Sequence, residues 1–122
     1  MARILVIDDY PAILGLLQLT LTTAGHEVVT ASDGVSGLAL AERVHPDLVL
    51  VDVDMPEMDG VAVCGGLKRD PGTRDIPVLL MTGRLSAQVM DRGRRVGAEG
   101  VLPKPFVRAR LLEEIERVTM GV

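Results

Sequence analysis

Acidic residues follow two apolar runs of this 122-residue sequence, at the point where each run ends. Asp8 and Asp9 come directly after the run at residues 3–7, and Asp52 comes directly after the run at 48–51. Clustered carboxylates repel one another unless protons or a cation neutralise them, and carboxylate oxygens are ligands that suit Mg2+. The three acids therefore predict a magnesium site, provided that the fold brings them together.

A hydroxyl and an ammonium follow two later runs. Thr82 comes after the apolar run at 76–81, and Lys104 comes shortly after the run at 100–102. A lysine is a mobile point charge of the kind that pairs with phosphate, and a threonine hydroxyl adds a hydrogen bond. A carboxylate nucleophile, a metal, a hydroxyl and an ammonium together make a phosphoryl-transfer site, where catalysis is mostly positioning and charge neutralisation. Asp52, which a turn rich in Pro, Asp and Gly follows at once, is the candidate reacting group.

The apolar runs alternate with amphipathic segments. Strands are expected at 3–7, 27–31, 48–51, 76–81 and 100–102, and helices at 11–24, 34–45, 60 to about 70, 86–96 and 108–118. Near-continuous apolar strands between amphipathic helices indicate a parallel sheet that is covered on both faces. Right-handed crossovers leave few topologies, of which the doubly wound order 2-1-3-4-5 is the commonest for five strands. We therefore predict an α/β fold, a flavodoxin-like (βα)5 domain.

This topology would gather the candidate residues at one place. Parallel strands put all their carboxyl ends on one edge of the sheet, and the acids, Thr82 and Lys104 follow the first, third, fourth and fifth strands. In the order 2-1-3-4-5 the first and third strands are neighbours at the switch point, where open α/β sheets bind ligands. Asp8, Asp9 and Asp52 are thus expected in one crevice.

The first helix is less clearly patterned. Helical spacing predicts an inward stripe of Ile13, Leu16, Leu17, Thr20 and Leu21. Leu14 and Leu19 fall off that stripe, so we expect them either to be exposed or to contact another protein. Both readings stay open on the sequence alone.

Composition and charge exclude some classes of function. Hydrophobic residues make up 48% and charged residues 25%, as in an ordinary globular domain, and the length fits one domain, residues 1–122. Thirteen basic against seventeen acidic residues give a net charge of −4, which argues against a dedicated nucleic-acid surface. The single cysteine, Cys64, cannot form an internal disulfide, and no apolar run approaches the roughly 18 residues of a membrane span. With no leader sequence in view, the expected location is the cytoplasm, away from membranes.

The motifs carry a resemblance to a known family. The chain resembles, over essentially its whole length, the receiver domain of two-component response regulators of the chemotaxis-regulator type, on these residues: Asp8-Asp9, Asp52 with Met55-Pro56-Glu57-Met58-Asp59-Gly60, Thr82, and Lys104-Pro105-Phe106. The resemblance implies that Asp52 accepts a phosphoryl group from a histidine kinase or a histidine phosphotransfer protein. It also implies a signalling phosphoacceptor that catalyses only its own phosphorylation and dephosphorylation, not an enzyme with other substrates.

The same resemblance implies roles for the other residues. Asp9, Asp52 and the main-chain carbonyl of Asp54 would ligate Mg2+, and Asp8 would act through water. Lys104 would contact the phosphoryl group, and Thr82 would move to bond it. The Lys104–Pro105 peptide bond would be cis, which is cheap only before proline.

Three positions depart from the family pattern or modulate it. Val101 stands where the family usually has Tyr or Phe, so the part of the switch in which an aromatic ring turns inward is in doubt. Asp54 and Arg84 occupy the positions two beyond the phosphoacceptor and two beyond the threonine, which influence the lifetime of the phosphoryl group in the family. Their opposite charges suggest that they pair across the mouth of the site and obstruct the attacking water.

Output and rival functions complete the expectations. The signal would pass to a downstream protein partner or to an effector domain removed after Val122. Leu14 and Leu19 of the first helix would either dock the phosphodonor or fill a thicker local core. Asp52-Val53-Asp54 also resembles the first motif of haloacid-dehalogenase-type phosphatases, but Met55-Pro56 and the Asp8-Asp9 pair do not fit that motif. A non-phosphorylated interaction module of the same fold would be expected to lose an acid, the threonine or the lysine, and this chain retains them all.

Overall fold

Five parallel strands form one sheet in the order β2-β1-β3-β4-β5. The structure is a computed structural model and describes residues 1–120. The strands are β1 (Arg3–Ile7), β2 (Glu27–Ala31), β3 (Leu48–Asp52), β4 (Val78–Thr82) and β5 (Gly100–Pro103). The helices are α1 (Pro11–Thr23), α2 (Gly34–Val44), α3 (Gly60–Arg69), α4 (Ala87–Arg95) and α5 (Arg108–Thr119). The predicted fold class and strand order are confirmed.

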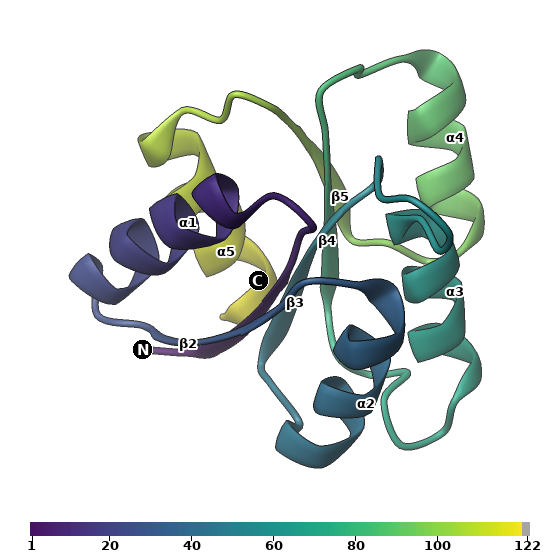
Figure 1. Cartoon of the computed structure of the whole chain (residues 1–122), viewed down its shortest axis with the longest axis horizontal. Helices are drawn as coiled ribbons and strands as arrows, with labels where there is room; N and C mark the ends of the chain where they lie inside the picture. Colours follow the sequence, from purple (N-terminus) through teal and green to yellow (C-terminus); the bar gives the residue numbers. More distant parts are fainter. Residues whose placement is uncertain (121–122) are drawn as a thin grey trace.

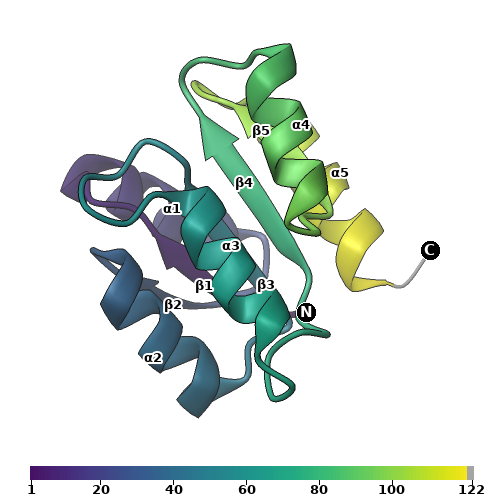
Figure 2. The same cartoon turned by 90° about the vertical axis from the view of Figure 1, so that its right-hand side faces the viewer.

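The helices cover both faces of the sheet. Figure 1 shows α1 and α5 on one side of the strands, and Figure 2 shows α2, α3 and α4 over the opposite face. Successive strand residues point to opposite faces, so Leu50 packs toward α1 and α5 while Val51 packs toward α2 and α3. This two-sided burial explains why β1, β3 and β4 are apolar without alternation.

Backbone register places the ends of the central strands side by side. Ile7 of β1 lies opposite Val51 of β3, and the next residue along each strand is Asp8 or Asp52. Thr82, at the end of β4, lies opposite Pro103 of β5, directly before Lys104. The four strand ends are therefore level with one another at one edge of the sheet.

Strand β4 begins at Val78, later than the expected residue 76. Pro77 has no N–H to donate to the sheet, although its carbonyl still accepts a hydrogen bond from the Val49 N–H at 3.0 Å. Asp52 and Thr82 are the last residues of their strands, where the sequence placed them just beyond. The Lys104–Pro105 bond is cis, as the resemblance implied.

The predicted inward stripe of α1 is wrong at Leu16. Leu16 is 49% exposed, whereas Leu14 packs partly into the core beside the fully buried Leu17 and Leu21. Leu19 is exposed, which is one of the two alternatives that the sequence left open for it. The stripe was misread because α1 carries apolar residues on all sides and no charged residue, so its periodicity does not define one inward face.

None of the helices within residues 1–120 is long and apolar enough to cross a membrane.

Candidate functional site

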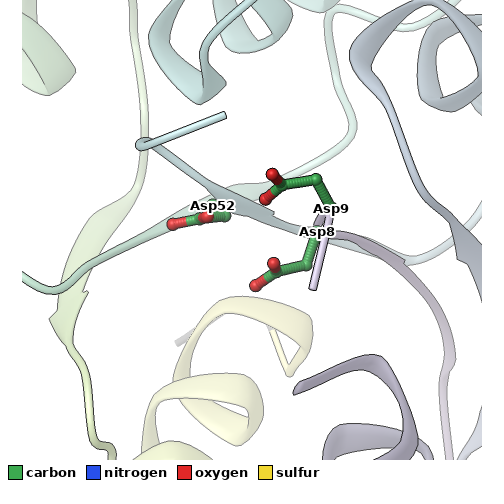
Figure 3. Close-up of side chains that lie close together, drawn as sticks. All are labelled: Asp8, Asp9 and Asp52. Carbon is green, nitrogen blue, oxygen red and sulfur yellow. The ribbon is translucent and has the colours of Figure 1, made fainter. Parts of the chain in front are cut away.

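Three carboxyl groups meet beyond the ends of β1 and β3. Asp8 and Asp52 are buried, at 0% and 3% exposure, while Asp9 is exposed. One oxygen from each of the three lies within 4.8 Å of the others, and Figure 3 shows the three side chains gathered at this edge. The sequence prediction that these acids converge is confirmed.

Lys104 brings a positive charge between the two buried acids. Its Nζ lies 3.0 Å from Asp8 Oδ2 and 3.2 Å from Asp52 Oδ1. The Lys104 backbone N–H donates to the Thr82 carbonyl at 2.7 Å, which fixes the start of the segment that carries the ammonium. The Tyr10 backbone N–H donates to the other oxygen of Asp8 at 3.0 Å. Both oxygens of Asp8 are thus held in place.

The electrostatics of the site favour a further cation. Burial raises the pKa of Asp52 above its usual range and the charge of Asp8 raises it further, against the Asp54 backbone N–H and Lys104. Burial would lower the pKa of Lys104, but its hydrogen bonds to Asp8 and Asp52 and their charges outweigh that effect and raise it. One ammonium faces three carboxyl groups, so the cluster carries negative charge that a divalent ion would neutralise.

The donor set fits Mg2+. This ion takes a few carboxylate oxygens and keeps several waters. Here Asp8, Asp9 and Asp52 offer oxygens close enough together to share one ion. The further ligand that the resemblance implies, the main-chain carbonyl of Asp54, stays a prediction.

Thr82 lies at the site, but its hydroxyl is turned toward Asp54. The Thr82 hydroxyl donates to Asp54 Oδ2 at 3.2 Å, and the Gly83 N–H donates to the same oxygen at 3.3 Å. Thr82 Oγ1 in turn accepts from the Arg84 N–H at 3.0 Å. This contact between Asp54 and the end of β4 was not foreseen from the sequence.

The structure therefore differs from the expected pairing of Asp54 with Arg84. Within residues 1–120 no ion pair joins these two side chains, and one oxygen of Asp54, Oδ2, instead accepts from Thr82 and Gly83. An exposed pair would also have to immobilise the long Arg84 side chain for little Coulomb energy. The influence of Asp54 and Arg84 on phosphoryl lifetime stays a prediction.

Gly60 positions Asp52, a role that the sequence did not predict; there Gly60 belongs to the turn after Asp52 and begins the next helix. A Cβ at Gly60 would overlap the Asp52 carbonyl oxygen, so the start of α3 can pack against the end of β3 only without a side chain. The Gly60 N–H donates to the Val53 carbonyl at 3.2 Å, and Asp59 caps α3 by accepting from the Ala62 N–H at 2.8 Å. The signal for this role in the sequence was the Asp59-Gly60 dipeptide in the turn after Asp52.

Val101 packs beneath α4. A Cβ added at Gly93 of α4 would lie 3.3 Å from Val101 Cγ2 and 3.0 Å from Leu80 Cδ1, so the helix approaches the sheet closely at this glycine. The lack of a side chain at Gly93 and the small side chain of Val101 thus allow a tight contact between α4 and β5. How the switch operates with a valine here stays open.

A parallel doubly wound sheet with an acid cluster and a lysine at its carboxyl edge defines a domain built to handle a phosphoryl group. The family model described as the response regulator receiver domain matches residues 4–116. The chain belongs to the response regulator receiver domain family.

Relatives and solved structures agree with this assignment. The chain is 44% identical over 115 residues to the DNA-binding dual master transcriptional regulator RpaA of Synechocystis, covering 94% of this chain and 48% of that protein. It is 38% identical over 121 residues to the protein PilH of Pseudomonas aeruginosa, covering 99% of this chain and 100% of PilH. The structure of the chemotaxis protein CheY4 of Vibrio cholerae superposes with a TM-score of 0.92 at 36% identity, covering 97% of this chain and 98% of that one.

The chain spans 48% of the length of RpaA and 26% of the length of the response regulator PleD of Caulobacter vibrioides, but all of PilH. The phosphatase and the non-phosphorylated module that the sequence left open are not favoured, because the family match covers the whole site from Asp8 to Lys104.

Proposed function

We propose that Asp52 accepts a phosphoryl group from a histidine kinase or a histidine phosphotransfer protein and that the domain relays the signal by a conformational change. The observation that carries this proposal is the placement of Asp52: a buried carboxylate at the end of β3, 3.2 Å from Lys104 and grouped with Asp8 and Asp9. Such a constellation neutralises and orients an incoming phosphate.

In the proposed step, a carboxylate oxygen of Asp52 attacks the phosphorus atom of the donor phosphohistidine. As the new O–P bond forms, the P–N bond breaks and its electron pair stays on the imidazole nitrogen, which takes up a proton from water. The Asp54 N–H and Lys104 both bind Asp52 Oδ1, which leaves Oδ2 as the attacking oxygen. The other product is an acyl phosphate on Asp52.

The neighbouring residues orient the group and balance its charge. Lys104 moves from the carboxylates to an oxygen of the transferred phosphoryl group, and the Thr82 hydroxyl turns to a second one. Asp9, Asp52 and the Asp54 carbonyl would hold Mg2+ directly and Asp8 would do so through water, and the ion would supply the positive charge that screens phosphate from the acids. The domain then catalyses only its own phosphorylation and hydrolysis.

The whole chain, residues 1–122, is proposed to be one receiver domain that acts in the cytoplasm. Its output would go to a protein partner, as in a stand-alone regulator, or to an attached effector domain. The full-length match to PilH supports the first arrangement, and the partial matches to RpaA and PleD support the second. The net charge of −4 supports an output without direct contact between this domain and nucleic acid.

Incubation with acetyl phosphate and Mg2+, followed by intact-mass measurement, tests this function. The expected result is one added phosphoryl group, which does not form when the metal is chelated beforehand and is absent from Asp52→Asn. Turnover of phosphate esters without a stable adduct would instead support the phosphatase. An adduct that persists in Asp52→Asn would contradict the proposal.

A further inference from the structure

The β3–α3 loop (residues 53–59) holds the end of β4 through the Asp54 side chain. One carboxylate oxygen of Asp54 accepts from both the Thr82 hydroxyl, at 3.2 Å, and the Gly83 N–H, at 3.3 Å. The Thr82 oxygen already accepts from the Arg84 N–H at 3.0 Å. A hydroxyl has one proton to donate, so Thr82 cannot donate to a phosphoryl group while it donates to Asp54.

The same loop holds α4 at a second point. Arg92 of α4 donates to Asp59 Oδ2 at 3.0 Å, while the other oxygen of Asp59 caps α3 through the Ala62 N–H. The two remaining ion pairs of α4, those of Arg94 and Arg95, are made within the helix to Asp91. In the described part of the chain, Arg92 is thus the arginine of α4 that links the helix to this loop.

We propose that Asp54 is a positioning residue that holds Thr82 and the start of α4 in the arrangement of the unphosphorylated domain, with the Asp59–Arg92 pair as a second, weaker link. The inference rests on the proposed function, because the Thr82 hydroxyl must break its hydrogen bond to Asp54 before it can donate to a phosphoryl group on Asp52. Phosphorylation then exchanges one hydrogen-bond acceptor of Thr82 for another. The side chain of Asp54 thereby sets how readily the domain adopts its phosphorylated arrangement.

The geometry indicates that the two bonds to Asp54 favour the unphosphorylated arrangement only modestly. Both bonds to Asp54 are slightly longer than the usual range, and Asp54 and Gly83 are exposed to solvent. Loss of two such bonds should shift the equilibrium between the two arrangements by about three- to tenfold. The exposed Arg92–Asp59 pair should contribute about twofold or less.

Beryllofluoride with Mg2+, a non-covalent stand-in for the phosphoryl group, gives the most direct test. Its affinity can be measured by 15N NMR titration of the wild type, Asp54→Ala and Asp54→Asn. Both variants remove a negative charge near the anion, but Asn keeps an oxygen that can accept from Thr82 and Gly83. We expect Asp54→Ala to bind about three- to tenfold more tightly than the wild type and more tightly than Asp54→Asn.

Two further comparisons separate the contact from general effects. In a Thr82→Val background, which lacks the hydroxyl, the advantage of Asp54→Ala over Asp54→Asn should shrink markedly. Arg92→Ala should raise the affinity slightly, and Arg95→Ala, which removes the same charge from the same helix, should not. In Asp54→Ala the Gly83 amide should also exchange its hydrogen faster, because its acceptor is gone.

The outcomes distinguish this inference from the function on which it rests. Asp54→Asn binding as tightly as Asp54→Ala, or an advantage of Asp54→Ala that survives intact in the Thr82→Val background, would overturn the role of Asp54 while leaving phosphorylation of Asp52 in place. Failure of every variant, the wild type included, to bind beryllofluoride or to take up a phosphoryl group would overturn the proposed function itself.

Discussion

At the scale of single residues, the positive charge of Lys104 opposes the binding of a metal ion to the acids but favours the binding of a phosphate beside them. Lys104 partly neutralises Asp8 and Asp52, each of which is buried and lies within 3.2 Å of its ammonium. A cation bound to the acid cluster must do so against the repulsion of this ammonium. The same ammonium becomes useful once a phosphate with its own negative charge arrives.

Lys104→Met should therefore bind Mg2+ more tightly than the wild type while accepting a phosphoryl group more slowly. Removal of the ammonium leaves the carboxylates with less neutralising charge, but it also removes a contact to the phosphate. A gain of about tenfold in metal affinity is expected from ~1.4 kcal/mol of relieved repulsion. Metal titration followed by NMR measures it, with Arg95→Ala as the control that removes a distant positive charge. Unchanged or weaker metal binding would contradict this reading of the site.

The raised pKa of Asp52 predicts how metal-free stability depends on pH. Because the pKa of Asp52 is higher in the folded chain than in the unfolded one, the folded state holds the proton more strongly. The stability that this group contributes is present at low pH and is lost as the pH rises through the folded pKa. Ionised Asp52 thus destabilises the folded state at neutral pH, because it is buried and lies beside the charge of Asp8.

Asp52→Asn should accordingly unfold at a higher temperature than the wild type at pH 7 in the presence of a chelator. The difference should shrink below the ordinary aspartate pKa of 3.8, where Asp52 is protonated in both states. Added Mg2+ should stabilise the wild type more than the variant, since the ion binds an acid that the variant lacks. Thermal unfolding at several pH values checks this prediction. A variant that is less stable than the wild type at pH 7 would show that the ionised Asp52 carboxylate does not destabilise the folded state.

The residues of the site could be predicted from the sequence, but the contacts among their side chains could not. Asp8, Asp9, Asp52 and Lys104 follow strands, so topology alone gathers them, and the structure confirms that they meet. The bond between Thr82 and Asp54 depends on loop geometry a few ångströms beyond the strands, which residue types and spacing do not define. The opposite charges of Asp54 and Arg84 suggested a pair, but the donors to Asp54 in the structure are the Thr82 hydroxyl and the Gly83 N–H.

At the scale of elements, Gly15 of α1 and Gly60 of α3 show that a glycine can be replaceable in one helix and required for packing in another. Gly15 lies in α1, where an added Cβ would meet nothing within 4 Å. Gly60 begins α3, where an added Cβ would overlap the backbone at Asp52. Helix propensity favours alanine at both positions, so any difference between the two reports the packing of α3 against β3.

Gly15→Ala should stabilise the domain by about 0.5–1 kcal/mol, and Gly60→Ala should destabilise it by about 2 kcal/mol or more. Gly60→Ala should also slow phosphorylation, since the backbone that carries Asp52 must shift. Urea unfolding of the two variants and phosphorylation by acetyl phosphate measure both effects. A Gly60→Ala variant as stable and as active as the wild type would remove this glycine from the positioning of Asp52.

Helix α1 presents an apolar, uncharged surface that starts beside the site. Leu16 and Leu19 are 49% and 66% exposed, and Tyr10, directly after Asp9, is 65% exposed. The sequence expectation for docking named Leu14 with Leu19, but Leu14 packs partly against the core. The surface available to a phosphodonor therefore includes Leu16 in place of Leu14.

Leu19→Glu should slow transfer from a cognate histidine donor by about tenfold and leave transfer from acetyl phosphate unchanged, because a small donor needs no docking surface. Val35→Glu is the matched control: Val35 is 67% exposed on α2, which covers the opposite face of the sheet. Transfer rates from both kinds of donor decide the matter. Equal slowing by the two variants, or slowing with both donors, would exclude a docking role for α1.

At the scale of the whole molecule, the pattern of apolar runs was sufficient to predict the fold. Strands buried on both faces and the alternation of strands with helices restrict the topology, and the observed order β2-β1-β3-β4-β5 is the one expected. The inward face of α1 was misassigned because an uncharged helix has no polar side to mark the outside. Periodicity thus predicts an element well and predicts its orientation only where charge and apolar character separate.

The molecule as a whole brings groups from 96 positions apart in the sequence to one edge, where the Lys104 ammonium binds Asp8. All other proposals depend on the reaction at that edge, the conversion of one carboxylate into an acyl phosphate. Borohydride reduces an acyl phosphate to an alcohol, so a phosphorylated aspartate becomes homoserine and keeps a record of its position.

Treatment with acetyl phosphate and Mg2+, then borohydride, then peptide sequencing by mass spectrometry locates the reacting group directly. Homoserine is expected at position 52 and at no other aspartate, with none formed when the metal is chelated. Reduction at Asp8, Asp9 or Asp54, or no reduction at all in a protein that has taken up phosphate, would contradict it.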